Sequence, residues 1–313
     1  MDRILSGVLG FAIGDAMGVP VEFTDRTKLL SNPVQEMLGF GSYDVPAGSW
    51  SDDTSMTLAT MDSVSKTGKI DCNDMAMLFC NWINNADYTA NGFVFDIGIT
   101  TKYALLKFMK DKCNASLCGG TGFNENGNGS LMRMLPIAFY CYYHKSDDND
   151  IYEIVKKVSS ITHAHEISIM GCYVYVKYVI NILNGQDKLQ SYKNIKNFDY
   201  ANYFQDDTIK AYDRILKDNI NELKVSEIDS NGYVVSTLET VLWTVINSNS
   251  YTQSIIVAVN LGNDTDTNAA ITGSVTGIIY GMETFPNEWL SKLERVDYIK
   301  DISEKFSSSL LKS

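Results

Sequence analysis

The chain has 313 residues, of which 45% are hydrophobic and 20% are charged, and its formal net charge is −12. This composition predicts a globular protein with a sizeable core and argues against a disordered chain. A general nucleic-acid binder needs a basic face, and no run of Lys and Arg provides one, so we expect no broad binding to nucleic acid or to an anionic membrane.

Two apolar segments resemble targeting or membrane sequences, but neither fits that interpretation. Residues 1–23 contain Asp2 and Asp15 and lack a clear small-x-small cleavage site, so we expect no signal peptide. Residues 167–183 contain Lys177 and are too short for a membrane span. The six cysteines show no C-x-x-C spacing, which indicates reduced thiols. We therefore expect a cytoplasmic protein without a membrane segment.

The dominant hydrophobic period along the chain is helical. The first predicted helix covers residues 3–17, where Gly7, Gly10 and Gly14 interleave with apolar side chains and would let another helix approach closely. The second begins after Ser51, a typical capping residue followed by an acidic first turn. The predicted helices after the first lie, in chain order, at residues 52–65, 74–83, 98–109, 132–143, 151–160, 166–183, 209–223, 233–247, 254–261 and 268–282.

Signals for β-structure are weak, because no hairpin dipeptide lies between two alternating runs. The sequence predicts an all-α fold in one globular domain, residues 1–313, with no repeat period and no linker. Two glycine-rich loops interrupt the helices, at residues 39–48 and 118–130. Residues 184–231 are polar, and we interpret them as a variable excursion between core helices.

The strongest chemical signal is a pair of acid-rich segments, WSDDTS at residues 50–55 and GNDTDTN at residues 262–268. Both lie beside apolar sequence, where carboxylates are costly unless they are paired or bind a metal. Each segment taken alone is equally typical of a helix cap or a turn. Together, with their flanking hydroxyls, they favour a site for a hard cation such as Mg²⁺ or Mn²⁺, which prefers oxygen ligands.

Other acid-based motifs do not fit these segments. An EF-hand loop would need glycine and glutamate where the chain has Ala269 and Val275. The two motifs of a terpenoid synthase would need acids where the chain has Met56 and Ile271. A D-x-D phosphatase motif should close a strand in an alternating βα chain, and no such alternation is present.

Six segments spread over most of the chain resemble the ADP-ribosylglycohydrolases, the family of dinitrogenase-reductase-activating glycohydrolase. They are GVLGFAIGDAMGVPVEF (7–23), WSDDTSMTLA (50–59), FDIGITT (95–101), GNGSLMRMLPIA (127–138), THAH (162–165), and the stretch from GYVVSTLETVLW to NLGNDTDTNAAITGSVTGIIYG (232–281). Together they are highly specific. The resemblance implies an all-α fold around a central cleft that contains two divalent metal ions, Mg²⁺ or Mn²⁺.

The resemblance also implies roles for individual acidic and hydroxyl side chains. The implied metal ligands are Ser51, Asp52, Asp53, Asp264, Asp266 and Thr267. The implied catalytic carboxylates are Glu22, Asp53, Asp96 and Asp266. Two metal ions would bind the ribose diol and activate water, while a further carboxylate would orient water or transfer a proton.

A glycine-rich loop before a predicted helix start is suited to bind the pyrophosphate through backbone N–H groups. The expected substrate-binding residues are Gly119, Gly120, Gly127, Asn128, Gly129, Ser130 and His163, the last from its place in the family pattern. Arg133 is open between a structural and a binding role. Tyr233 and Trp243 are open between adenine stacking and the core.

We expect a hydrolase that cleaves an ADP-ribosyl N- or O-glycosidic bond, removing mono-ADP-ribose from a modified protein side chain, with arginine favoured. One alternative is a non-catalytic ADP-ribose-binding or immunity-type protein of the same fold. Another is a hydrolase of a different ADP-ribosyl small molecule or modified base. The sequence leaves open the linkage, the choice between Mg²⁺ and Mn²⁺, and the oligomeric state.

Overall fold

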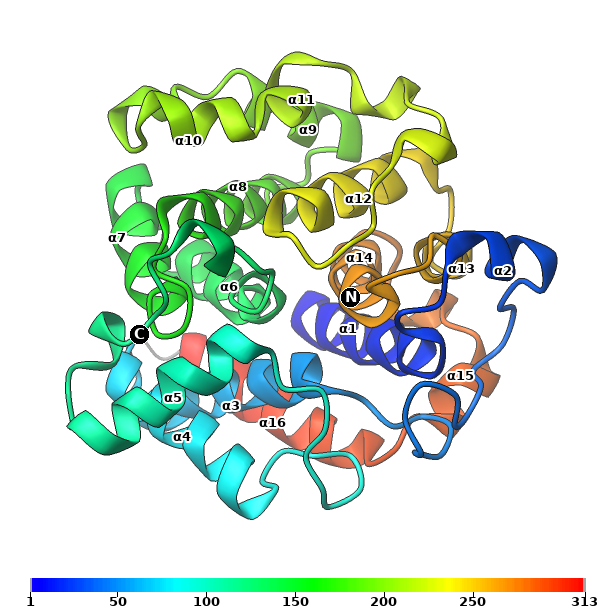
Figure 1. Ribbon diagram of the computed structural model, residues 1–313, viewed down its shortest axis with the longest axis horizontal. Helices are drawn as coiled ribbons and strands as arrows, with labels where there is room; N and C mark the ends of the chain where they lie inside the picture. The colour runs from blue at the N-terminus through cyan, green and yellow to red at the C-terminus, as the bar shows by residue number, and fades with distance from the viewer. Residues whose placement is uncertain (1, 312–313) are drawn as a thin grey trace.

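The structure, a computed structural model, describes residues 2–311 and consists of helices joined by loops (Figure 1). No β-sheet forms within these residues; two isolated bridges pair Gly120 with His163 and Gly127 with Tyr233. The predicted all-α fold is therefore confirmed.

The α-helices of the described residues are interspersed with short 3₁₀ turns. In chain order they are α1 (Arg3–Gly18), α2 (Arg26–Ser31), α3 (Asp52–Thr67), α4 (Cys72–Asn85), α5 (Ile99–Asp111), α6 (Leu135–Tyr143), α7 (Asp148–Ser159), α8 (Glu166–Leu183), α9 (Lys188–Lys196), α10 (Asp206–Ala211), α11 (Asp213–Lys217), α12 (Val234–Asn247), α13 (Tyr251–Asn260), α14 (Thr265–Tyr280), α15 (Asn287–Lys292) and α16 (Val296–Leu310). The bounds of α8 are those the sequence predicts. The predictions missed α2, α9, α15 and α16.

The central helices α1 and α14 pack against each other over most of their length (Figure 1). A Cβ atom on Gly14 would lie 2.1 Å from the carbonyl oxygen of Ala269, and one on Gly18 would lie 2.3 Å from the Cα of Asp266. Only glycine allows such a close approach of two backbones. The predicted close approach of another helix to the glycines of α1 is thus present, and its partner is α14.

The predicted helix at residues 209–223 is wrong as a single element. The chain bends at Tyr212, between α10 and α11, and leaves helical geometry at Asp218. The bend lets the Tyr212 ring enter the core, where its hydroxyl donates to the carbonyl oxygen of Ile167 at 2.7 Å. A tertiary contact therefore decides where this helix is interrupted.

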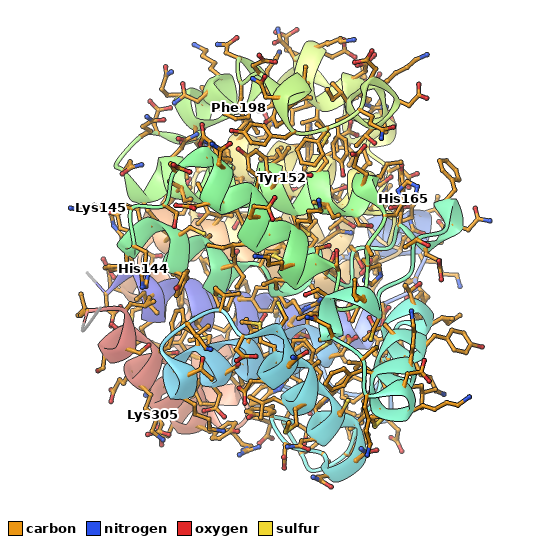
Figure 2. The ribbon with its side chains drawn as sticks, turned by 90° about the vertical axis from the view of Figure 1, so that its left-hand side faces the viewer. His144, Lys145, Tyr152, His165, Phe198 and Lys305 are labelled. Atoms are coloured by element: carbon orange, nitrogen blue, oxygen red, sulfur yellow. The ribbon has the colours of Figure 1, made fainter. Side chains whose placement is uncertain are left out.

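The excursion, residues 184–231, forms a layer of short helices over α7, α8 and α12 (Figure 1). An aromatic cluster fixes it to α7 and α8, in the region where Figure 2 labels Tyr152 and Phe198. Tyr152 contacts Tyr203 and Phe204, and Tyr173 contacts Phe198, Tyr203 and Phe204, at ring-centroid distances of 5.3 to 5.8 Å. The excursion is thus a packed part of the domain.

Two helical stretches are long and apolar enough to cross a membrane, Arg3–Val21 and Glu166–Leu183. Within the fold, 89% of the first and 78% of the second is buried. Such burial is typical of the core helices of a globular protein.

Candidate metal centre and substrate cleft

The site is organised around Asp15, a fully buried carboxylate in the last turn of α1. Its Oδ1 accepts a hydrogen bond from the backbone N–H of Ser51 at 2.9 Å. Its Oδ2 accepts from the backbone N–H and the hydroxyl of Thr54, at 3.0 and 2.6 Å. Because these donors belong to the first turn of α3, Asp15 caps that helix and fixes its start against α1.

The predicted acidic turn at the start of α3 lies where the sequence places it. Ser51 is the N-cap, and its hydroxyl accepts from the backbone N–H of Asp53 at 3.3 Å. Asp52 and Asp53 occupy the first helical turn and are 7% and 1% exposed. Both helix capping and a metal site are therefore compatible with Ser51.

The second acidic segment forms the start of α14. The chain turns before it at Gly262 and Asn263, which both have positive φ angles, 77° and 60°. The Asn263 N–H donates to the carbonyl oxygen of Thr24 at 2.9 Å, which ties this turn to the segment that carries Glu22. Asp264 lies at the N-cap position and Asp266 lies in the first turn.

The fold brings these distant carboxylates into two groups that share one member. In the first group, oxygens of Asp15, Asp53 and Asp266 all lie within 4.8 Å of one another. In the second, oxygens of Glu22, Asp96 and Asp266 satisfy the same distance. Asp266 is therefore the junction of the acidic centre. Such spacing is compatible with oxygen ligation of hard divalent cations.

Hydrogen bonds cross between the two halves of the centre. The hydroxyl of Thr267 lies 3.5 Å from Oδ1 of Asp53, across 214 positions of sequence. The side-chain amide of Asn128 donates to Oδ2 of Asp264 at 2.6 Å. Burial raises the pKa of Asp264, and the hydrogen bond from Asn128 partly offsets that shift. Asn128 thus orients an acid of the centre from the glycine-rich loop.

The acidic centre has the electrostatic character of a cation site. Burial, reinforced by neighbouring carboxylates, raises the pKa values of Asp52, Asp53 and Asp266 well above their usual range and that of Glu22 to about 9. Among the described residues, no Lys, Arg or His forms an ion pair with these acids. Glu22 Oε2, Asp53 Oδ2 and Asp266 Oδ2 are buried without a hydrogen-bond partner in that part of the chain. Buried oxygens in this condition fit divalent metal ions.

A cavity of about 260 Å³ opens over the acidic centre. The predicted residues that line it are Glu22, Asp52, Asp53, Asp96, Gly127, Asn128, Gly129, His163, Asp264 and Thr267. The predicted residues outside its lining are Ser51, Gly119, Gly120, Ser130 and Asp266. Asp266 remains part of the centre through both carboxylate groups.

The glycines at 119 and 120 have a role different from the predicted phosphate cradle. Their backbone N–H groups donate to the carbonyl oxygens of Ser160 and Thr162, at 3.0 and 2.9 Å, so they are not free for a ligand. They instead support the segment that carries His163. The Ser130 hydroxyl also points away from the cavity, because it contacts Cys172 Sγ at 3.3 Å and accepts from Ser159 at 3.0 Å.

The loop from Gly127 to Ser130 leads into a 3₁₀ turn, Leu131–Arg133, and not directly into the predicted helix, which begins as α6 at Leu135. Arg133 is fully buried and donates to the carbonyl oxygens of Gly129 and Val158 at 2.5 and 3.0 Å. Of the two roles that the sequence left open for Arg133, these contacts favour the structural one.

The aromatic candidates for adenine stacking differ in exposure. Trp243 is 6% exposed and donates its indole N–H to the carbonyl oxygen of Leu223 at 3.0 Å, which makes it part of the core. Tyr233 is 36% exposed and lies next to Gly232, which lines the cavity. Only Tyr233 therefore has a ring surface available to a ligand.

Sequence reasoning assigned no role in the site to Asp15, Tyr43 or Thr101. A lone carboxylate inside the apolar, glycine-rich first helix was the available signal for Asp15. Thr101 lines the cavity with a buried hydroxyl that has no partner among the described residues. Burial and the charges of Asp96 and Glu22 raise the pKa of Tyr43. Because Tyr43 lies in a loop, no hydrophobic period in the sequence indicates its place in the site.

Comparison with known proteins decides the family. The family profile described as ADP-ribosylglycohydrolase matches residues 1–312. The chain belongs to the ADP-ribosylglycohydrolase family. It is thus a member of a family of glycosidic-bond hydrolases, as the six sequence segments indicate.

Individual ADP-ribosylglycohydrolases align with nearly all of this chain. It is 31% identical to ADP-ribosylarginine hydrolase Tri1 of Serratia proteamaculans (strain 568), covering 97% of this chain and 79% of that protein. It is 27% identical to the ADP-ribosyl-[dinitrogen reductase] glycohydrolase of Rhodospirillum rubrum, covering 94% and 90%. A solved structure described as an ADP-ribosylglycohydrolase-related protein complex superposes with a TM-score of 0.82 at 25% identity, covering 99% and 98%.

Proposed function

We propose that this ADP-ribosylglycohydrolase uses two divalent cations, Mg²⁺ or Mn²⁺, to hydrolyse the bond between ADP-ribose and an arginine side chain of a modified protein. The observation that carries the proposal is the pair of carboxylate groups that share Asp266 and lack a cationic partner among the described residues. A cavity beside such a centre is a suitable place for metal-assisted hydrolysis.

The residues that would hold the cations are assigned from the sequence prediction together with the observed geometry. They are Ser51, Asp52, Asp53, Asp264, Asp266 and Thr267, with Glu22 and Asp96 approaching from the second carboxylate group. Asp15 would act behind them, because both of its oxygens already accept hydrogen bonds from the start of α3. We therefore assign Asp15 a positioning role.

The chemistry divides between the bound ions and the chain. Divalent cations would supply positive charge for the ribose oxygens and a bound water of lowered pKa. Glu22 would hold or transfer a proton at Oε2, the oxygen that has no partner among the described residues. Asp96 would place negative charge close to the ribose, which stabilises an oxocarbenium-like state at C1.

Preference for arginine is supported by the surroundings of Asp96. The Phe95 ring lies 4.9 Å from Tyr43 and 5.8 Å from Phe93, and Phe93 is 46% exposed. Guanidinium groups stack on aromatic faces and pair with carboxylates, and this part of the chain provides both features. The similarity to two ADP-ribosylarginine hydrolases supports the same linkage.

The proposal is tested by incubating the protein with peptides ADP-ribosylated on arginine or on serine, with Mg²⁺, with Mn²⁺, and with a chelator. We expect release of ADP-ribose from the arginine peptide, dependent on the metal and lost in Asp266→Asn. Release from serine alone would reassign the linkage. Tight ADP-ribose binding without turnover would instead support the non-catalytic alternative. Turnover of only a small ADP-ribosyl compound would support the other alternative.

We also place the protein in the cytoplasm, where its six free cysteines would remain reduced. Fractionation of the producing cell tests this placement.

A further inference from the structure

His163 forms part of the cavity wall with one edge of its ring. The residue is 3% exposed, and its Cε1 and Nε2 atoms lie against the loop that contains Gly127 and Gly129. A Cβ atom on Gly129 would come within 2.8 Å of His163 Cε1, and one on Gly127 within 3.7 Å of Nε2. The two glycines therefore leave the Nε2 edge open to the cavity.

The opposite edge of the ring ends in a chain of buried polar groups. His163 Nδ1 lies 2.8 Å from the hydroxyl oxygen of Thr162. That oxygen lies 2.9 Å from Nη1 of Arg133. Thr162 and Arg133 are both 0% exposed, so water does not compete for these hydrogen bonds.

The protons available to each group decide which atom donates and which accepts in this series of hydrogen bonds. An arginine side chain only donates, so the Thr162 oxygen accepts from Arg133. The Thr162 oxygen could also accept a second hydrogen bond from His163, but the buried hydroxyl proton would then have no acceptor among the described residues. Donation of that proton to Nδ1 pairs every group, so Nδ1 is the acceptor. In a neutral imidazole one nitrogen accepts while the other carries the proton, so that proton lies on Nε2.

We infer that Arg133 and Thr162 are positioning residues that hold His163 in the Nε2–H tautomer, as a fixed neutral donor to a phosphate oxygen of the ligand in the cavity. The choice of ligand rests on the proposed function, with ADP-ribose as the compound bound. The tautomer itself follows from the protein alone.

The charge state of the ring supports this role. Burial, together with the positive charge of Arg133, lowers the pKa of His163 to about 3, whereas Arg133, with a pKa of about 10, stays charged at neutral pH. The imidazole is therefore neutral throughout the physiological range and does not titrate during turnover. Among residues 2–311 the only hydrogen bond of the His163 ring is that of Nδ1, and the ring lines the cavity, so Nε2 offers its proton to a ligand.

The tautomer can be read directly, because the chain has only three histidines. We would record long-range ¹H–¹⁵N imidazole spectra of the full-length ¹⁵N-labelled protein without ligand. His144→Asn and His165→Asn variants assign the signals, since both residues lie at the half-buried surface, well apart in Figure 2. We expect a neutral His163 with an unprotonated Nδ1 and a protonated Nε2 from pH 5.5 to 8.5. A protonated Nδ1, or titration within that range, would overturn the inference.

A matched pair of substitutions tests the hydrogen-bond relay, meaning the series from Arg133 through the Thr162 hydroxyl to His163 Nδ1. Thr162→Val preserves the volume but removes the hydroxyl, whereas Thr162→Ser retains it. In Thr162→Val we expect the Nδ1 and Nε2 shifts to move toward each other as the second tautomer becomes populated, with Thr162→Ser resembling wild type. Unchanged shifts in a folded Thr162→Val would overturn the relay. Should the valine variant not fold, the wild-type spectrum still decides the tautomer.

The role in binding is measured by calorimetric titration with ADP-ribose. We expect the Kd to rise about tenfold in Thr162→Val and to stay within about threefold of wild type in Thr162→Ser, the scale of one hydrogen bond to a charged group. A shifted tautomer with an unchanged Kd would overturn the ligand contact. Failure of wild type to bind ADP-ribose would count against the proposed function, while the spectra decide the relay independently.

Discussion

Two regions of this molecule bury acidic side chains, and they differ in what neutralises the charge. At the cleft, carboxylates lie side by side with no ion pair to a cationic side chain of the described residues. On α12, Glu239 is 6% exposed and pairs with Arg214 of the excursion at 2.8 Å. The pKa of Glu239 is raised only to about 7, because Arg214 counteracts part of the effect of burial.

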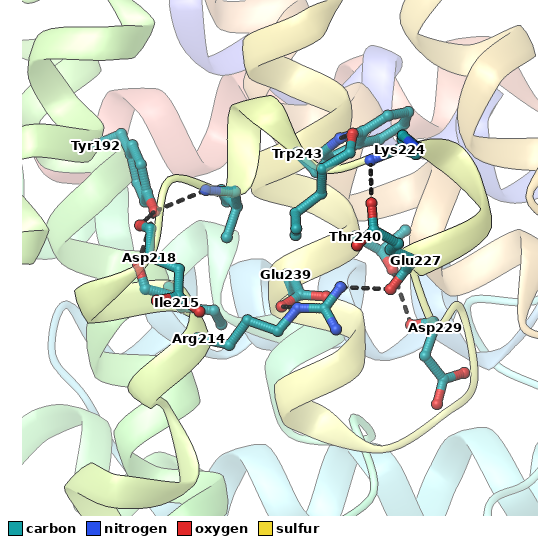
Figure 3. Close-up of polar contacts among 12 residues, drawn as sticks. Tyr192, Arg214, Ile215, Asp218, Lys224, Glu227, Asp229, Glu239, Thr240 and Trp243 are labelled. Atoms are coloured by element: carbon teal, nitrogen blue, oxygen red, sulfur yellow. Dashed lines mark hydrogen bonds and ion pairs between the residues drawn. The ribbon is translucent and has the colours of Figure 1, made fainter.

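The Glu239 region has the character of a structural clamp. Arg214 also donates to the carbonyl oxygen of Glu227, and the Thr240 hydroxyl donates to that of Asp229 at 3.1 Å (Figure 3). Trp243, further along α12, likewise donates its indole N–H to a carbonyl oxygen of the excursion, that of Leu223. A buried acid with its own arginine fixes one segment onto another, whereas buried acids without a cation are poised to bind one from solution.

The two regions also differ in how they are assembled. The cleft depends on the close approach of two helix backbones, α1 and α14, at Gly14 and Gly18. The excursion depends on side-chain hydrogen bonds and aromatic contacts with α7, α8 and α12. Changes at the cleft should therefore affect activity most, and changes at the excursion should affect stability.

Asp266→Asn should have the largest effect. Because Asp266 belongs to both carboxylate groups, we expect hydrolysis to fall by at least about a hundredfold, the upper range for changes to groups that merely support metal ligands. The metal-free variant should melt no lower than wild type, since one of several repelling buried acids is removed. Turnover and thermal melting with a chelator measure both. Asp301→Asn, at a surface ion pair with Lys305, is the control and should change neither.

Gly14→Ala should damage the scaffold of the cleft. Its Cβ would meet the carbonyl oxygen of Ala269 at 2.1 Å, so we expect a loss of about 3 kcal/mol in unfolding free energy, measured by urea denaturation. Gly7→Ala is the matched control, because its Cβ meets only side-chain atoms, at 3.1 Å or more, which can shift. Equal losses in the two variants would contradict the close backbone contact.

Arg214→Met should destabilise the clamp without abolishing hydrolysis. It leaves Glu239 buried without its cation, but 44% of the Arg214 side chain is exposed. We therefore expect about 1–2 kcal/mol, below the cost of breaking a fully buried pair. Urea denaturation measures the loss. A fall in activity beyond about threefold would show that the excursion controls the cleft.

Glu239→Gln should have the smallest effect and a distinct pH dependence. The folded-state pKa of Glu239, about 7, lies above its ordinary value, so its contribution to stability is complete in acid and is lost as the pH rises through about 7. Glutamine does not ionise, so relative to wild type the variant should gain about 1 kcal/mol between pH 5 and pH 8, after discounting for solvent screening. Melting curves across that range measure it. A constant difference would show that Glu239 does not titrate there.

Much of the helical framework and of the acidic centre was predictable from local sequence. The bounds of α8 follow from its long, largely apolar run, and the start of α3 follows from Ser51 and its acidic neighbours. The helix α16 was missed although it buries Ile299, Ile302 and Phe306 at helical spacing, a signal that the sequence did contain. The interruption at Tyr212 had no such local signal, because a contact with Ile167 determines it.

The sequence by itself determined which oxygen-bearing residues are available as cation ligands. The acidic segments around Asp53 and Asp266 can be recognised because their carboxylates lie next to apolar runs. Tertiary structure alone decided which of them converge. It placed Asp15 behind α3, and it used the backbone N–H groups of Gly119 and Gly120 for another segment. The reason is physical: local sequence specifies helix periodicity and capping, whereas distances between carboxylates are set by how closely α1 and α14 pack.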